Sequence, residues 1–234
     1  MAGTGNEYQE MVLRKMKDLK HRPFGAVKIE GTFGGIPYSL ILLADGCEKD
    51  PEMVSLLARW RKKHESWFPA VFRVTVEGTA RWLKNQVIET PDRLLFMIRV
   101  DGRYMGHVGL FRFHFDQREC EIDNIVRGED DSPGIMGEAI RRMMDWGKAE
   151  LGLEKYELVT FSDNQKSLHL YRRLDFAEVR RVPLQRVEKE DRVEWVETSG
   201  EDFPKIERYN VYMELSGKIK KLGDRGPRGM GRKL

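Results

Sequence analysis

Apolar and polar residues follow two kinds of spacing along this chain, one typical of strands and one of helices. Two β-like runs within residues 26–43 are separated by Gly34-Gly35, which predicts a hairpin. Three more strand-like segments follow in the middle of the chain, and an Asp101-Gly102 pair between the first two is a strong hairpin signal. We therefore predict an antiparallel meander over residues 94–100, 104–113 and 119–126.

Helical spacing is clearest over residues 135–151, where apolar residues share one face and charged residues the opposite one. Gly152 directly follows and predicts a left-handed helix end. Helices are also expected over residues 1–20, 52–63, 75–87 and 164–174, and strands over 156–161, 176–182 and 207–215. Strand–helix–strand units appended to a meander predict an α/β fold, a mixed sheet flanked by helices.

The net charge of +3 is unevenly distributed over the 234 residues. Residues 217–234 carry seven Lys/Arg and one Asp, a net +6, so that the rest of the chain sums to −3. We predict a disordered, solvated basic tail, with contacts to nucleic acid or anionic membrane as the alternative. Nothing in the acidic body requires a nucleic-acid partner, and none is expected.

Several classes of protein do not match the composition. No apolar run reaches the roughly 18–20 residues that a membrane span requires, and residues 1–22 are too polar for a secretion signal. Cys47 and Cys120 are too few for a disulfide framework and lack the spacing of metal ligands. We expect a cytoplasmic protein without a metal.

The strand-to-helix junction at residues 126–139 is the most informative segment. Pro133, Gly134 and Gly137 lie where the helix is predicted to begin, and glycines let another group approach the backbone closely. Free N–H groups at a helix N-terminus bind phosphate. From these residues alone, a diphosphate site and an ordinary helix start packed through small residues both remain open.

A wider resemblance favours the diphosphate site. The stretch EIDNIVRGEDDSPGIMGEAIRRMMDWGKAELGL is followed by Asn164, Ser167, Tyr171 and Phe176 at the spacing of an N-x-x-(A/S)-x-x-x-Y helix and the strand after it. This half of the chain resembles the acetyl-CoA-binding half of the GNAT N-acetyltransferases. LARWRKKHESWF and GHVGL resemble upstream elements of the RimJ-like branch.

The resemblance spans residues 38–183 and implies a centrally splayed sheet. It divides the chain into an N-terminal extension (1–24), a GNAT domain (25–216) with an added hairpin-like excursion (185–205), and the tail (217–234). Asp131 stands where the family usually has Gln or Arg, Met136 where it has Gly or Ala, and Asp175 where it has Gly.

The resemblance also implies residue roles, with acetyl-CoA as the acyl donor. Tyr171 would be the general acid that protonates the CoA sulfur, although a half-buried core tyrosine is the alternative. The backbone of Ile125, Val126 and Arg127, and Asn164, would hold the pantetheine arm. The remaining cofactor-binding residues would be those of the diphosphate loop, Ser132, Gly134, Ile135, Met136 and Gly137.

Three acids, Glu119, Glu121 and Asp123, alternate along one face of a predicted strand. Burying them would be costly, which favours a polar cleft, while an exposed sheet edge is the alternative. Glu121 matches the position of an acid in the family pattern and is our first choice as base, with Asp123 second. His107 and His114 on the preceding strand receive no role.

The acceptor is the least determined feature. The resemblance favours a small-molecule amine, first the amino group of a nucleotide-linked sugar. A protein N-terminus, a polyamine, or a non-enzymatic acyl-CoA-binding module are the alternatives. A homodimer is compatible with the resemblance. The 185–205 excursion, which contains Trp195, either closes over an acceptor or is a surface hairpin.

Overall fold

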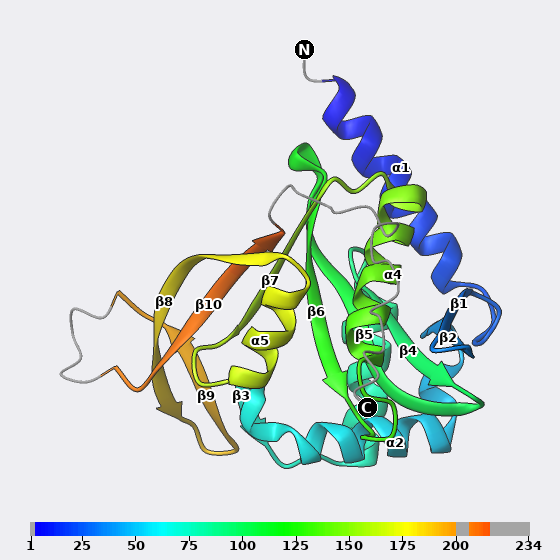
Figure 1. Ribbon diagram of the computed structural model, residues 1–234. Helices are drawn as coiled ribbons and strands as arrows, with labels where there is room; N and C mark the ends of the chain where they lie inside the picture. Colours follow the sequence, from blue (N-terminus) through cyan, green and yellow to red (C-terminus); the bar gives the residue numbers. More distant parts are fainter. Residues whose placement is uncertain (1–2, 200–205, 216–234) are drawn as a thin grey trace, which may run out of the picture.

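The structure is a computed structural model that describes residues 3–199 and 206–215. Its core is one ten-stranded sheet in the order β1-β2-β4-β5-β6-β7-β10-β8-β9-β3 (Figure 1). The strands are β1 (Lys28–Phe33), β2 (Ile36–Leu42), β3 (Ala70–Phe72), β4 (Leu94–Val100), β5 (Arg103–His114), β6 (Glu119–Arg127), β7 (Lys155–Phe161), β8 (Phe176–Glu188), β9 (Arg192–Glu197) and β10 (Arg208–Leu215).

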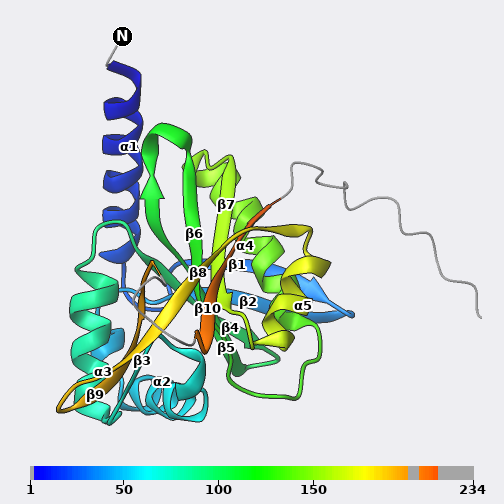
Figure 2. The ribbon, with the colours of Figure 1, turned by 90° about the vertical axis from the view of Figure 1, so that its left-hand side faces the viewer.

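Helices cover both faces of the sheet. They are α1 (Gly3–Lys20), α2 (Pro51–Lys63), α3 (Val76–Trp82), α4 (Ile135–Leu151) and α5 (Gln165–Arg173). Figure 2 shows α2 and α3 on one side of the strands and α4 and α5 on the other. The predicted α/β class with a mixed, splayed sheet is therefore confirmed.

Strand β4 explains why both faces are covered. Leu94, Phe96 and Ile98 belong to the apolar cluster beneath α4, whereas Leu95 and Met97 belong to the cluster beneath α2. All five side chains are at most 1% exposed. A strand buried on both faces reads as a continuous apolar run instead of an alternating one, as this one does.

Local sequence signals set the main boundaries. Helix α4 spans the predicted residues 135–151 and ends at Gly152, whose φ of 69° lies in the left-handed region. The Thr75 hydroxyl accepts a hydrogen bond from the N–H of Gly78 and caps α3, as predicted. The expected helix over 75–87 differs in its second half, because α3 changes at Trp82 into a π-helical turn, Leu83–Ile88.

The N-terminal segment packs on the rest of the molecule. Val12 and Met16 of α1 are fully buried in the same apolar cluster as α4. The Tyr8 hydroxyl donates to the carbonyl of Leu151 over 2.9 Å. The α1 helix therefore contributes to the core that supports α4.

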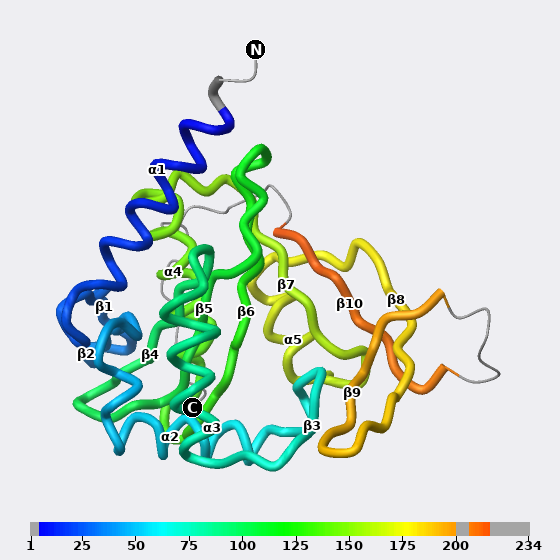
Figure 3. The backbone as a smooth tube through the Cα atoms, turned by 180° about the vertical axis from the view of Figure 1, so that it is seen from behind, coloured from blue at the N-terminus to red at the C-terminus, as the bar shows by residue number. Residues whose placement is uncertain are grey.

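The excursion expected at 185–205 is a hairpin where the structure describes it. Strand β8 continues to Glu188 and β9 returns beside it. Strand β9 then pairs with β3, which follows α2 in the sequence (Figure 3). Residues 200–205 and the predicted basic tail, 217–234, lie outside the described residues.

Candidate active site

A cleft opens in the middle of the sheet, between β6 and β7. These neighbours are parallel, and their ladder covers only Glu119–Glu121 against Lys155–Glu157. Beyond this short ladder the two strands diverge, and residues 122–127 of β6 have no partner in β7. The resulting cleft has a volume of about 1200 Å³. Unpaired backbone groups along β6 are thereby available to an extended ligand.

The cleft brings together nearly all the predicted site residues. Its lining includes Glu121, Asp123, Ile125, Val126, Arg127, Ser132, Gly134, Met136, Gly137, Asn164 and Tyr171. Ile135 is the exception, because its side chain is fully buried in the core beneath α4 and its N–H donates to the carbonyl of Ser132 over 3.3 Å. The cofactor-binding role expected for Ile135 therefore stays a prediction, and it would not involve the buried side chain.

The two candidate bases are each held by an arginine. Glu121 Oε2 accepts a hydrogen bond from Arg112 over 2.6 Å, and Asp123 Oδ2 accepts one from Arg93 over 2.5 Å. Both acids are 8% exposed. Burial raises the pKa of Glu121, while the neighbouring Arg112 cation lowers it. Glu119 lies outside the lining of the cleft.

Strand β6 contains a β-bulge beside these acids. His107 of β5 lies opposite Val126, and Gly109 opposite Asp123, so that two residues of β6 face one residue of β5. Asn124 within the bulge has a φ of 47°, in the left-handed region. The bulge was not predicted from the sequence.

Tyr171 projects from α5 into the other wall of the cleft. It is 4% exposed, and burial raises the pKa of its phenol to about 12, so it is protonated at neutral pH. Asn164 caps the same helix, because its side-chain oxygen accepts the N–H of Ser167 over 3.2 Å. Asp175 after the helix has a φ of 65°, which accounts for the glycine usual at this position in the family it resembles.

The loop before α4 is the segment expected to bind the diphosphate. Gly134 has a φ of 91°, and a Cβ there would lie 3.0 Å from the Phe33 ring. Asp131 pairs with Arg103 over 2.7 Å and is absent from the lining of the cleft. The acid that departs from the family pattern is thus neutralised outside the cleft, while the start of α4 faces it.

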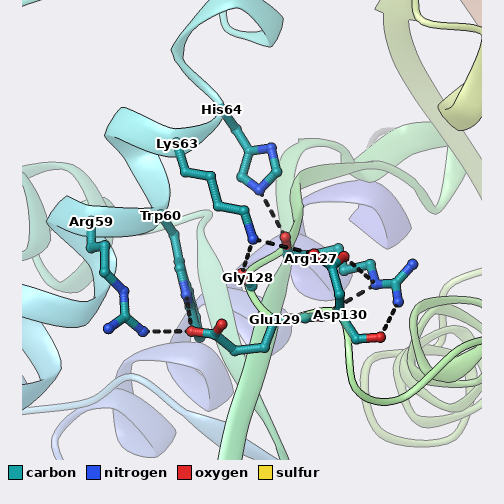
Figure 4. A network of polar contacts seen from close by, with 8 residues as sticks. All are labelled: Arg59, Trp60, Lys63, His64, Arg127, Gly128, Glu129 and Asp130. Carbon is teal, nitrogen blue, oxygen red and sulfur yellow. Dashed lines mark hydrogen bonds and ion pairs between the residues drawn. The ribbon is translucent and has the colours of Figure 1, made fainter.

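The C-terminal end of helix α2 holds the loop that follows β6 through side-chain hydrogen bonds (Figure 4). His64 hydrogen-bonds to the carbonyl of Arg127 over 2.8 Å, and Lys63 donates to the carbonyl of Gly128 over 2.8 Å. His64 lines the cleft, and burial lowers its pKa, so that it is neutral at pH 7. No specific pattern in the sequence marks His64, which is one polar residue at a basic helix end.

A second part of this network joins Trp60 and Arg59 of α2 to Glu129 of the loop. The indole Nε1 of Trp60 donates to Glu129 over 2.9 Å, and Arg59 pairs with the same carboxylate over 2.5 Å. Gly128 lies on the indole ring, where a Cβ would come within 2.0 Å of Trp60. The position of the loop is therefore set by the face of Trp60 and by the two donors around Glu129.

The end of the cleft away from α4 is closed by the segment after α2. Trp67, Phe68 and Pro69 line it, and the N–H of Trp195 in β9 donates to the carbonyl of Pro69 over 2.8 Å. The Arg208 guanidinium lies 4.7 Å from the Trp195 ring centroid. The hairpin, for which closure over an acceptor and a surface location were both left open, thus pairs with a segment that lines the cleft.

The polar groups that line the cleft are suited to acyl transfer. A buried phenol, a buried carboxylate and unpaired backbone N–H groups can move protons and stabilise negative charge on oxygen. Residues 3–199 and 206–215 contain no group of three His, Cys, Asp or Glu side chains that could hold a metal ion. None of their helices is long and apolar enough to cross a membrane.

Comparison with known proteins gives one family. The model of the acetyltransferase (GNAT) domain matches residues 41–177, more than half of the chain. Spermidine N(1)-acetyltransferase of Escherichia coli K12 is 29% identical over 111 residues. That alignment covers 47% of this chain and 59% of the relative, so the chain matches about three-fifths of the relative's length.

Solved structures share the fold. A ribosomal L7/L12 α-N-protein acetyltransferase, RimL, has a TM-score of 0.60 and 11% identity, covering 82% of this chain and 97% of that chain. Spermidine N-acetyltransferase from Vibrio cholerae, in complex with CoA and spermine, has a TM-score of 0.55 and 19% identity over 76% of this chain and 95% of that chain.

Proposed function

Because the chain belongs to the acetyltransferase (GNAT) family, we propose that it transfers an acetyl group from acetyl-CoA to a primary amine in the β6–β7 cleft. The observation that carries this proposal is the convergence of Glu121, Tyr171 and the start of α4 on one cleft. A base, an acid and an anion site are the three elements that direct acyl transfer from a CoA thioester requires.

The donor fits the residues present. The N-terminal end of α4, with Ser132, Gly134, Met136 and Gly137 in the lining, would hold the diphosphate without a basic side chain. Arg127 is engaged with Asp130 and neighbouring carbonyls, so its backbone is the part available to the pantetheine arm. Asn164 would bind the same arm from α5.

The proton transfers follow from the electrostatics. Glu121, with its raised pKa, would accept a proton from the ammonium of the acceptor, directly or through water, and so release the neutral amine that attacks. A backbone N–H of β6 would stabilise the negative charge on the thioester oxygen. Tyr171, still protonated at neutral pH, would then protonate the departing thiolate as the C–S bond breaks. The second proton of the nitrogen, lost as the amide forms, would pass to solvent, from which the phenol of Tyr171 is restored.

For the acceptor, we retain the amino group of a nucleotide-linked sugar as first choice. Polyamines are recognised by carboxylates, and four acids line the cleft in the described residues. Glu121 and Asp123 bond to arginines, Asp130 pairs with Lys63 and Arg127, and Glu197 accepts from Asn210, while the buried Oδ1 of Asp123 has no partner among the described residues. Trp67, which is 41% exposed, adds a flat apolar surface suited to a sugar or a base. The names of the relatives keep polyamines and protein N-termini as alternatives.

The direct test measures CoA thiol release from acetyl-CoA with a panel of acceptors: amino-sugar nucleotides, spermidine and peptides with free N-termini. Thermal stabilisation by CoA is measured in parallel, because a ligand that binds only the folded state raises the melting temperature. We expect stabilisation by CoA and turnover of at least one amine class. Stabilisation without turnover of any amine would instead favour a binding module.

A further inference from the structure

His107, to which the sequence assigns no role, is buried between the sheet and α2. Its side chain is 4% exposed on β5, and its Nδ1 lies 2.7 Å from the carbonyl oxygen of Asn124 on β6. The ring centroid of Trp60 lies 6.1 Å from that of His107 on the α2 face of the sheet. A polar ring buried this deeply is costly unless it makes a specific hydrogen bond.

The hydrogen bond goes to the backbone of the bulge in β6. Asn124 belongs to the bulge, where Asp123 still pairs with Gly109 and Val126 with His107, while Asn124 and Ile125 have no partner residue in β5. A left-handed φ of 47° at a non-glycine residue is uncommon and needs support from its surroundings. The His107 ring contributes to that support through the Asn124 carbonyl, together with the side-chain amide of Asn124, which donates to Asp123 Oδ2 over 2.7 Å.

We infer that His107 is a positioning residue for acetyl transfer, because its Nδ1–H holds the Asn124 carbonyl and so fixes the bulge that leaves the Ile125 N–H available to the thioester oxygen. This inference rests on the proposed function. Ile125 lines the cleft next to Asp123, on the stretch of β6 that β7 leaves unpaired. His107 itself is absent from that lining and acts through the backbone of β6.

The tautomer of the ring follows from its partner. A carbonyl oxygen only accepts hydrogen bonds, so the proton must reside on Nδ1. Burial lowers the pKa of His107 to about 4, and the nearby His64 acts in the same direction. The ring therefore stays neutral, with a protonated Nδ1, at neutral and alkaline pH.

The test compares two variants that differ in one property. In His107→Asn, the side-chain amide nitrogen can occupy the position of Nδ1 and donate to Asn124, whereas His107→Leu fills similar space without a donor. We expect His107→Leu to lower kcat by roughly tenfold or more, within the cost of displacing one donor to an oxyanion, with KM for acetyl-CoA changed less than about threefold. His107→Asn should recover most of kcat.

Two further measurements do not depend on turnover. The carbonyl ¹³C shift of bound [1-¹³C]acetyl-CoA reports polarisation of the thioester, and should move toward its free value in His107→Leu but not in His107→Asn. Imidazole ¹⁵N shifts of the ligand-free wild type should show a protonated Nδ1 and an unprotonated Nε2 from pH 6 to 8.

Three outcomes would overturn the inference: an unchanged kcat in folded His107→Leu, an equal loss of kcat in both variants, or an Nε2–H tautomer in the wild type. If His107→Leu does not fold, the inference is tested by the kcat of His107→Asn and by the tautomer of the wild-type ring. If the wild type acetylates no amine, the proposed function fails, whereas the ¹³C and ¹⁵N measurements still test the role of His107.

Discussion

Arg112 Nη1 donates a hydrogen bond to Glu121 Oε2 over 2.6 Å, from the strand beside the carboxylate. Arg112 has a φ of 51°, at a register shift of the β5–β6 ladder between Phe111 and His114. Burial raises the pKa of Glu121 and the Arg112 cation lowers it, so the arginine adjusts the basicity of the proposed base. This pair gives a test of the base that does not remove it.

Arg112→Gln should shift the acidic limb of the kcat/KM profile to higher pH, because loss of the cation raises the pKa of Glu121. Arg118→Gln is a matched control, since Arg118 also has a left-handed φ, of 50°, and pairs with a glutamate, Glu154. Its substitution should leave the profile unchanged. An acidic limb that stays in place in Arg112→Gln would assign the base elsewhere.

Glu121→Gln should reduce kcat/KM by roughly 10²-fold near neutral pH, as for one general base, and the loss should shrink at high pH where more of the amine is already neutral. Glu119→Gln on the same strand, outside the lining of the cleft, is the control and should keep the wild-type rate. Measurement of kcat/KM from pH 6 to 10 distinguishes the two. A loss that is constant with pH would argue against a base role.

Tyr171→Phe should lower kcat by about 10²-fold while leaving affinity for CoA unchanged, because the ring remains and only the proton donor is lost. Tyr156→Phe removes another buried hydroxyl, which donates to the carbonyl of Met144 outside the cleft. This control should lower the melting temperature but not kcat. Wild-type turnover in Tyr171→Phe would place the proton source on another group.

Gly137 offers a test of the anion site that spares the helix. It is the third residue of α4, lines the cleft, and a Cβ there would make only an ordinary contact, 3.4 Å from Leu170. An acid in the first turn stabilises a helix but repels a diphosphate. Gly137→Asp should therefore retain its melting temperature and lose roughly tenfold in CoA affinity, about 1.4 kcal/mol.

Gly137→Asn is the isosteric neutral control, and calorimetric titration with CoA measures both variants. The difference in affinity between them should narrow as salt is raised, because the repulsion is screened. Equal affinities of the Asp and Asn variants at low salt would show that the diphosphate lies away from α4. Gly134 is unsuited to this test, since its φ of 91° strains any other residue.

His107 predicts a pH dependence of stability. Its pKa is about 4 in the folded protein against 6.5 for an ordinary histidine, so the unfolded chain binds the proton more readily. The free energy of unfolding should fall as the pH drops from 6.5 toward 4, by at most ~1.4 kcal/mol per pH unit for this one proton. Urea titrations at several pH values give the free energy of unfolding of wild type and His107→Asn. This free energy should change less with pH in the variant.

Much of the fold followed from short-range sequence signals. Helix α4 and its stop at Gly152, and the turns at Gly34-Gly35 and Asp101-Gly102, depend on neighbouring residues and were predicted correctly. The bulge at Asn124 was missed, because no local pattern marks a residue that leaves the ladder. The pairing of β3 with β9 was also missed, since it joins distant segments.

Most residues expected to share the site do line one cleft, whereas their polar partners were not expected. Resemblance placed Glu121 and Tyr171 on the same cleft although fifty residues of chain separate them. It could not show that arginines hold both acids, because Arg93 lies just before β4 and Arg112 on β5, and neither carries a motif. His64 was missed for the same reason.

The pairing of β3 with β9 has a consequence for how the chain folds. Residues 70–72 and 192–194 meet only after some 120 intervening residues have been gathered, and closing a loop of that length is entropically costly. The β3–β9 ladder is also short, so it stabilises the folded chain little until β8 and β10 have formed. We therefore expect the wall formed by Trp67, Phe68 and Pro69 to be the last part of the cleft to form during refolding, and the first to open under mild denaturant.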